Sequence, residues 1–386
     1  MLRDILTSFL KIGLTAYGGP AIIGVMQAEF QERRQWIGKP QFVEGLAFVN
    51  MLPGATATQL GIFLGHERAG WLGGLLAGFG FCAPAFAIML VLTVAYAALG
   101  VSPWLRGALY GLGPIVLAVF GVAVYRLGGT ALRSRTHILI ALSAAAAALV
   151  APVATVWIML CAGSLGLFLF YRRSIGVVAV FAVALALVAA RVVAWTPRFM
   201  TPVPGAVPSL TDVVVQFGVI GAVTFGGSLT IIGLLQDQFV HQLGWLTPQE
   251  FIDGLALGQL TPGPPVMLAT YVGYKALGLT GAVVAAIAIF APSFVMMFAL
   301  LPVFERVRAL GWAKAALQGM VAGIIGVLAV TLVRLTPHAV VDPFSAVIFI
   351  CAVTALLLWR MAPLKMVAGG AVLGIVRRRL VTAIGF

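Results

Sequence analysis

Charged residues are scarce in this chain. Only 9% of its 386 residues are Asp, Glu, Lys or Arg, whereas 62% are hydrophobic, and residues 138–150 and 177–190 carry no charge at all. About a quarter of the residues of a soluble globular domain are charged, so this composition excludes one. The apolar runs are continuous and rich in Ala, Leu and Gly, which excludes a barrel of alternating strands. The sequence therefore predicts an all-α polytopic membrane protein in contact with membrane lipid.

Other features that point to particular functions are also missing. Acidic residues number 11 against 24 basic ones, and in a membrane protein this excess is typical of cytoplasmic loops, so no nucleic-acid partner is expected. The three cysteines, Cys82, Cys161 and Cys351, lie far apart in apolar segments and indicate neither a disulfide nor a metal site. The motifs HExxH, GxGD and GxSxG are absent from the sequence, so we expect neither an enzyme nor a cofactor.

The chain repeats itself at a spacing of 208 or 209 residues. The stretch "TAYGGP" at 15–20 corresponds to "VTFGGS" at 223–228, and "VNMLPGATATQLG" at 49–61 corresponds to "LGQLTPGPPVMLA" at 257–269. Further matches at this spacing are Trp36 with Trp245, Gly70 with Gly278, Pro84 with Pro292, Arg106 with Lys314 and Arg126 with Arg334. Chance does not produce such a series, so the chain consists of two homologous halves.

We expect an N-terminal membrane repeat at 1–194 and a C-terminal membrane repeat at 211–386, joined by a proline-rich linker at 195–210 that cannot be helical. The first half has one helix more than the second. The hydrophobic pattern predicts helices over 7–30, 43–66, 70–99, 104–126, 136–150, 152–171 and 175–194, and then over 211–236, 250–276, 278–304, 312–334, 339–360 and 363–376.

The first two segments of each half contain a Gly-Gly or Pro-Gly break, although each is long enough to cross a bilayer of about 30 Å. A break frees backbone N–H and C=O groups, which is tolerated at membrane depth only where protein or a watered cavity satisfies them. If every segment crosses the membrane, the 24 basic residues divide almost evenly between the two sides. If the broken segments are re-entrant hairpins, two thirds of these residues gather on one side, so the positive-inside rule favours hairpins.

Either arrangement gives the first half an odd number of crossings, so the second half enters the membrane upside down. Inverted repeats whose broken helices meet near the midplane are typical of secondary transporters. For a single break, close packing of helices through Gly and Pro is the simpler interpretation, but four breaks at matched positions favour a binding site. A passive channel lined by the same helix ends stays open as an alternative. A homodimer is one assembly compatible with such a chain.

The chemistry of the breaks favours an anion. A helix that starts after a break directs unpaired N–H groups and the positive end of its dipole at that break. Hydroxyl and amide side chains nearby add neutral donors, and a small tetrahedral oxyanion suits such a site. The candidate substrate-binding residues are Gly18, Gly19, Pro20, Asn50, Pro53, Gly54, Thr56, Thr58, Gln59, Gly226, Gly227, Ser228, Gln259, Thr261, Pro262, Gly263 and Pro264.

Two carboxylates occupy equivalent positions, because Glu44 and Asp253 each lie nine residues before the proline of a Pro-Gly break. A carboxylate at membrane depth is a functional candidate, here for proton coupling. A cap at the start of each hairpin is an equally good interpretation. The equivalent arginines Arg126 and Arg334 are predicted to be interfacial anchors rather than ligands.

These residues carry a resemblance to a known family. The patterns "GGP" and "LPG...TQLG" in the first half, with "FGGS...GWLTPQEFIDGLALGQLTPGP...YVGY...APSF" in the second, resemble the chromate ion transporter family in its long, two-domain form. The similarity spans nearly the whole chain and is most specific at 244–263. It implies a secondary transporter that exports chromate, with sulfate as its structural analogue, across the cytoplasmic membrane of a prokaryote, giving chromate resistance.

The resemblance also assigns motif positions and shows two departures. Ile23 stands where members often have a histidine, and Ala55 stands where they often have the second proline of "PGP". The missing histidine removes a contact for an anion or a proton, which leaves the exact oxyanion and the coupling ion open. The motif carries over to Gly18, Gly19, Pro20, Pro53, Gly54, Thr58, Gln59, Phe225, Gly226, Gly227, Pro262, Gly263 and Pro264.

Overall fold

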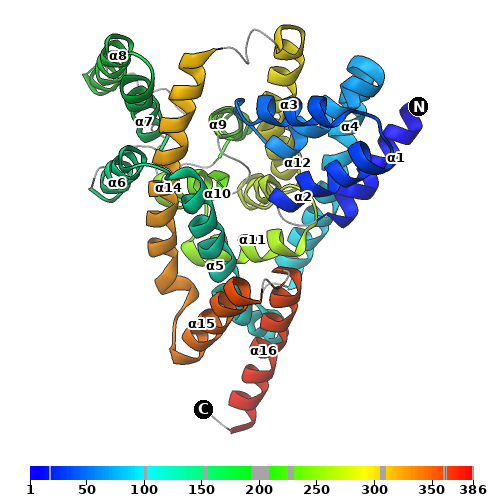
Figure 1. Ribbon diagram of the computed structural model, residues 1–386. Coiled ribbons are helices and arrows are strands. Elements are labelled where there is room, and N and C mark those ends of the chain that lie inside the picture. Colours follow the sequence, from blue (N-terminus) through cyan, green and yellow to red (C-terminus); the bar gives the residue numbers. More distant parts are fainter. Residues whose placement is uncertain are drawn as a thin grey trace.

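The computed structural model describes residues 1–16, 19–99, 102–150, 155–192, 208–224, 230–304, 310–359, 361 and 363–384. Every secondary-structure element within these ranges is a helix, as Figure 1 shows, so the predicted all-α class is confirmed. Most of the predicted linker at 195–210 lies outside the described residues.

The described helices follow the predicted order, except that the four broken segments are divided at their breaks. Four helices are long and apolar enough to cross a membrane: Thr56–Leu99, Trp104–Ala131, Pro265–Val303 and Gly311–Ala339. The first half contains α1 (Leu2–Thr15), α2 (Gly19–Met26), η1 (Gln27–Arg33), α3 (Lys39–Val49), α4 (Thr56–Leu99), α5 (Pro103–Ala131), α6 (Arg135–Val150), α7 (Thr155–Phe170) and α8 (Arg173–Val192). The second contains α9 (Leu210–Val223), α10 (Thr230–Gln236), η2 (Asp237–Gln242), α11 (Pro248–Leu260), η3 (Pro265–Met267), α12 (Leu268–Leu300), η4 (Leu301–Val303), α14 (Gly311–Ala339), α15 (Pro343–Leu358) and α16 (Pro363–Ile384).

The longest helix of each half reverses direction at a glycine. Gly70 in α4 and Gly278 in α12 both have a φ of 62°, a conformation that costs little only for glycine. After this turn α4 folds back on itself, and Gly65 packs so closely against Gly73 that a Cβ on either would overlap the backbone of the other. The equivalent glycines of α12 pack in the same way. Each of these helices is therefore a hairpin with a short first arm and a long second arm.

The broken segments of the first half also return to the side on which they start. Arg34, which follows η1, forms an ion pair with Asp4 at the start of α1, with 2.7 Å between Nη1 and Oδ1. Arg68, at the end of the first arm of α4, lies over the Trp36 ring, 5.6 Å from its centroid, and Arg34 lies over the same ring. The start and the end of the first broken segment and the end of the second therefore lie together around Trp36. This is the arrangement expected of re-entrant hairpins, which return to the side on which they start.

The second half repeats this arrangement. Lys275 Nζ lies 2.6 Å from Glu250 Oε1, which joins the end of the first arm of α12 to the start of α11. A stack of three aromatic rings supports the first hairpin of each half: Phe9, Phe30 and Trp36 in one, and Phe217, Phe239 and Trp245 in the other. The two halves therefore share their packing as well as their sequence pattern.

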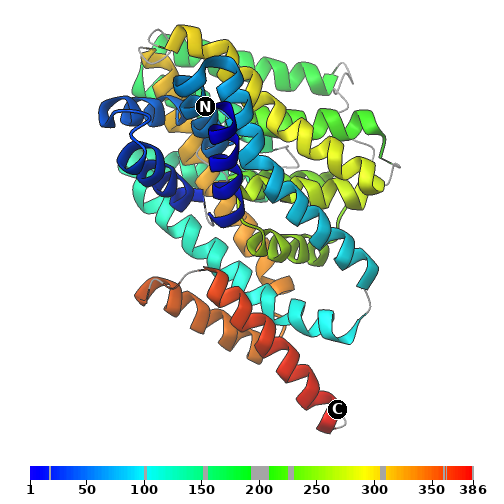
Figure 2. The same ribbon diagram turned by 90° about the vertical axis from the view of Figure 1, so that its right-hand side faces the viewer.

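The two repeats are inverted and exchange helices. The equivalent helices α5 and α14 run in opposite directions in Figures 1 and 2, and α14 packs against α6 and α7 while α5 packs against α15 and α16. Arg126 Nη2 donates to Leu356 O at 2.8 Å, and the equivalent Arg334 Nη2 donates to Ala148 O at 2.6 Å. Reciprocal contacts of this kind indicate a two-fold relation. These arginines, predicted to be interfacial anchors, bind the last carbonyls of helices in the opposite repeat, where the helix dipole favours a cation.

The last helix is longer than predicted. The structure extends α16 from Pro363 to Ile384 instead of ending it near residue 376, so the arginine run at 377–379 is helical. Arg377 Nη2 lies 2.6 Å from Asp342 Oδ2, and its guanidinium lies 4.3 Å from the centroid of the Tyr110 ring. The helix continues through this charged run because the Asp342 carboxylate and the face of the Tyr110 ring stabilise the charge of Arg377.

Candidate functional site

Each Pro-Gly break binds the segment that leads into the Gly-Gly break of the other half. Gly54 N donates to Thr224 O at 2.7 Å, and Gly263 N donates to Ala16 O at 2.8 Å. Ala16 and Thr224 are themselves 208 residues apart, so the two contacts are equivalent. The breaks therefore meet at the interface between the inverted repeats. In transporters built from inverted repeats, this interface is where the substrate binds.

The Gly-Gly breaks are only partly within the described residues. Gly19 begins α2, with Pro20 as its second residue. Asn50, predicted to be a donor, is exposed at the end of α3. The predicted site residues that lie outside the described ranges are Gly18, Gly226, Gly227 and Ser228, together with the motif residue Phe225.

The first Pro-Gly break is buried and polar. The exposed fraction is 6% for Thr56 and 0% for Thr58 and Gln59. Gly54 has a φ of 123°, a region that favours glycine, and Gln59 Nε2 reaches across the break to donate to Pro53 O at 2.6 Å. Because α4 begins at Thr56, its first N–H groups have no partner within the helix and point towards this break. Of the polar side chains predicted here, Gln59 bonds across the break, whereas Thr58 Oγ1 lies 3.6 Å from Cys82 Sγ.

Ser293 lies at the same break and was missed by sequence reasoning. Its Oγ accepts a hydrogen bond from Ala55 N at 2.9 Å, and its side chain is fully buried. It packs so closely on Gly54 that a Cβ there would overlap the hydroxyl. Two signals could have found it: Ser293 lies in the "APSF" stretch at 291–294, and the equivalent residue of the first half, Ala85, has no hydroxyl.

The second Pro-Gly break is buried but less polar. Residues 261–264 are all buried, and the Thr261 hydroxyl donates to Leu257 O of its own helix at 2.9 Å. Gln259 is half-buried. A short turn at Pro265–Met267 precedes α12. The predicted donors of this break are therefore present, but Thr261 directs its hydrogen at its own backbone.

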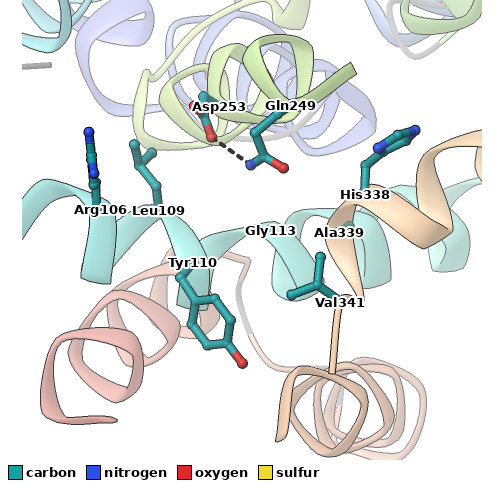
Figure 3. A pocket seen from close by; sticks show the side chains of 9 residues that line it. All are labelled: Arg106, Leu109, Tyr110, Gly113, Gln249, Asp253, His338, Ala339 and Val341. Atoms are coloured by element: carbon teal, nitrogen blue, oxygen red, sulfur yellow. Dashed lines mark hydrogen bonds between the residues drawn. The ribbon is translucent and has the colours of Figure 1, made fainter. Parts of the chain in front are cut away.

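Asp253 joins the two halves and lines a pocket, shown in Figure 3. Its exposed fraction is 6%, its Oδ2 accepts from Tyr96 OH of α4 at 2.9 Å, and its Oδ1 accepts from Gln249 Nε2 at 3.2 Å. The pocket has a volume of about 240 Å³ and lies between α11, the start of α5 and the end of α14. Its lining residues are Arg106, Leu109, Tyr110, Gly113, Gln249, Asp253, His338, Ala339 and Val341.

The caps of α11 and α3 are formed by residues other than Asp253 and Glu44. Thr247 and Glu250 form the cap of α11, with Thr247 N donating to Glu250 Oε2 at 2.9 Å. In α3 the corresponding acceptor is Gln41 Oε1, which receives a hydrogen bond from the backbone N–H before the helix at 3.3 Å. Both carboxylates lie one turn further along, where no cap is needed.

The chain matches the chromate transporter family model twice, over residues 3–167 and 211–375. The chromate transport protein of Cupriavidus metallidurans is 30% identical over 391 residues, which cover 97% of this chain and 93% of that protein. The chromate transport protein of Pseudomonas aeruginosa is 36% identical over 335 residues, covering 85% and 79%. The chain belongs to the chromate transporter family.

Within this family the chain is a transporter rather than a member of an enzyme class, and its apolar helices make it a multi-pass protein of the cell membrane. An uncharacterised transporter of Methanocaldococcus jannaschii is 25% identical over 369 residues, covering 92% of this chain and 89% of that protein. No solved structure matches the chain. The two family matches are offset by 208 residues, which is the spacing of the sequence repeat.

Proposed function

We propose that this chain is a secondary transporter that exports chromate, or exchanges it for a sulfate-like oxyanion, across the cytoplasmic membrane and so gives chromate resistance. Family membership supports chromate as the transported ion. The buried breaks support a binding site for it, since each helix N-terminus aimed at an anion contributes about 0.3–2 kcal/mol. The predicted Gly-Gly and Pro-Gly residues are the proposed site.

One observation carries the secondary mechanism: the two equivalent hairpins differ in packing. On α3, Val43, Ala47 and Asn50 form a single exposed stripe, and the exposed fraction of Val43 is 55%. The equivalent Ile252 and Ala256 on α11 are only 2% and 1% exposed, because α11 packs against α5 and α14. Equivalent elements of inverted repeats in unlike environments are expected in one end state of an alternating-access cycle.

The opposite end state follows from exchanging these two environments. In it, α3 packs against α14 as α11 now packs against α5, and α11 is released. The exchange needs no new kind of contact, because each repeat adopts the conformation that the other already has. Both states are populated when their free energies differ by no more than a few kcal/mol.

Cysteine accessibility tests this mechanism. In a variant without Cys82, Cys161 and Cys351, we expect Val43→Cys to react with a membrane-impermeant maleimide from one face of the membrane only. Ile252→Cys should react from the opposite face, and only while chromate is being transported. Chromate flux into proteoliposomes is measured alongside, with a pH gradient or potential imposed.

A passive anion channel is the second candidate, because the same helix ends could line a selective pore. A channel open to both sides would leave both cysteines reactive at once, and it would not move chromate against its gradient. Uphill flux together with labelling of one cysteine at a time supports the transporter. Labelling of both cysteines without turnover would refute it.

Proton coupling through Asp253 belongs to the same proposal. This carboxylate is buried against Tyr96 of the other half and lines a pocket, so a proton on it could be exchanged with one side of the membrane. Glu44 is its equivalent on the exposed hairpin. If the hairpins exchange environments, the two carboxylates exchange access to water as well.

A further inference from the structure

The two Pro-Gly breaks are equivalent in position but differ in hydrogen bonding. At the first break, Ala55 supplies a backbone N–H and Ser293 Oγ accepts it at 2.9 Å. At the second, Pro264 takes the place of Ala55 and Ala85 takes the place of Ser293, so the donor and the acceptor are both missing. Pro265 removes a further N–H from the start of the second helix. Only the first break therefore combines a helix start rich in N–H groups with a buried hydroxyl.

Gln59 provides a second and independent observation. Its Nε2 donates to Pro53 O at 2.6 Å, and because a carbonyl can only accept, this contact fixes which way the amide points. Gln59 Oε1 is then a fully buried acceptor to which none of the described residues donates. A buried acceptor without a donor is strongly unfavourable. Gln59 Oε1 would therefore be satisfied by a ligand that donates a hydrogen bond to it.

We propose that the oxyanion binds at the first Pro-Gly break alone, that Ser293 is one of its ligands, and that the anion carries one proton, which it donates to Gln59 Oε1. This inference rests on the proposed function, whose site it narrows. The Ser293 oxygen already accepts from Ala55 N, so the hydrogen of its hydroxyl is available to an anion oxygen. The N–H groups at the start of α4 donate hydrogen bonds to the remaining oxygens of the anion.

A protonated anion also explains how this site can distinguish oxyanions of the same shape. Chromate takes up its first proton near neutral pH, whereas sulfate does so only in strong acid. At neutral pH sulfate therefore brings no hydrogen to Gln59 Oε1 and leaves that acceptor unpaired. A site that hydrogen-bonds a hydroxyl rejects analogues without it far more strongly than shape alone allows.

Isothermal titration calorimetry of the purified full-length protein with chromate tests the site. Ser293→Thr keeps the hydroxyl, while Ser293→Val replaces it with a methyl group of nearly the same shape, so this pair separates hydrogen bonding from packing. We expect Ser293→Thr to bind chromate like the unmodified protein and Ser293→Val to bind roughly 10–100-fold more weakly. Ala85→Ser is the matched control and should leave the affinity unchanged, since its hydroxyl would face Pro264.

The proton on the anion is tested by repeating the titration across the pH range in which chromate is protonated. The apparent affinity for total chromate should rise as the pH falls, while sulfate stays weak throughout. Sulfate is also the control for titration of the protein, because its own charge stays constant. The carboxylates, the imidazole and the thiol on α4 and the helices packed against it are Asp4, Glu44, His66, Glu67, Cys82, Glu250 and Asp253. A pH effect that comes from any of these protein groups would appear in the binding of sulfate as well as chromate.

Three results would overturn the inference: equal chromate binding by Ser293→Thr and Ser293→Val, a loss of affinity in Ala85→Ser as large as in Ser293→Val, or a chromate affinity that changes with pH only as that of sulfate does. The proposed transport is judged separately, by flux in proteoliposomes. Chromate binding that needs the Ser293 hydroxyl, combined with no chromate flux, would refute the transport function and leave the site assignment standing.

Discussion

Replacement of Gly54 by alanine should abolish transport. Gly54 has a φ of 123°, and a Cβ there would overlap Ser293 Oγ and lie 2.7 Å from Gln59 Nε2. The backbone conformation costs a non-glycine residue about 1–3 kcal/mol, and the crowding costs about as much again. Displacing Ser293 also removes its hydrogen bond from Ala55 N, a loss of about 0.5–1.5 kcal/mol. The total, about 2.5–7.5 kcal/mol, is enough to weaken anion binding by roughly 100-fold or more.

Chromate uptake into proteoliposomes measures this effect, with the amount of protein in the membrane determined for each variant. Gly244→Ala is the control, because Gly244 also has a positive φ, 63°, but no atom lies within 4 Å of the position of its Cβ. That variant bears only backbone strain of about 1–2 kcal/mol and should transport normally. Near-normal transport by Gly54→Ala at normal abundance would mean that the break is only a packing device.

Three further predictions follow from the same contacts. Asp253→Asn should abolish pH-driven chromate flux but leave anion exchange, because the amide cannot release a proton; unchanged pH-driven flux would make this side chain structural. Gln59→Ala should raise the half-saturating chromate concentration about 10-fold without abolishing flux, since one hydrogen bond to the ligand is lost; an unchanged value contradicts it. Burial acts to raise the pKa of Glu250, but Lys275 and Thr247 hold that pKa below its ordinary value. The stabilisation is therefore present above the unfolded-state pKa of about 4.3 and is lost as the pH falls through the folded-state value. Lys275→Met should accordingly lower Tm at pH ~7, and by progressively less as the pH falls below the unfolded-state pKa; a loss of Tm that does not change with pH would contradict the ion pair.

The sequence was sufficient to predict the repeats and the positions of the breaks. Glycine is favoured where φ is positive, so the chain reversal at Gly70 is visible in the sequence as a glycine that recurs at Gly278. The contact between Ser293 and Ala55 spans 238 residues, and that between Asp253 and Tyr96 spans 157. Such contacts depend on how the inverted halves pack, and no local pattern in the sequence specifies them. The site was therefore predicted as a set of breaks, without the side chains that the other half supplies.

The hydrogen bonds between the breaks limit how the two proposed end states can interconvert. Gly54 N–Thr224 O ties the second hairpin of the first half to the first break of the second half, and Gly263 N–Ala16 O does the reverse. These backbone groups are buried, so breaking their hydrogen bonds without replacement is costly. If both hydrogen bonds are kept while α3 and α11 exchange environments, these two helices must rotate about the breaks. In that case the breaks act as hinges and the hairpins act as gates. The ion would then stay beside Gly54 and Ser293 while access to it passes from one side of the membrane to the other.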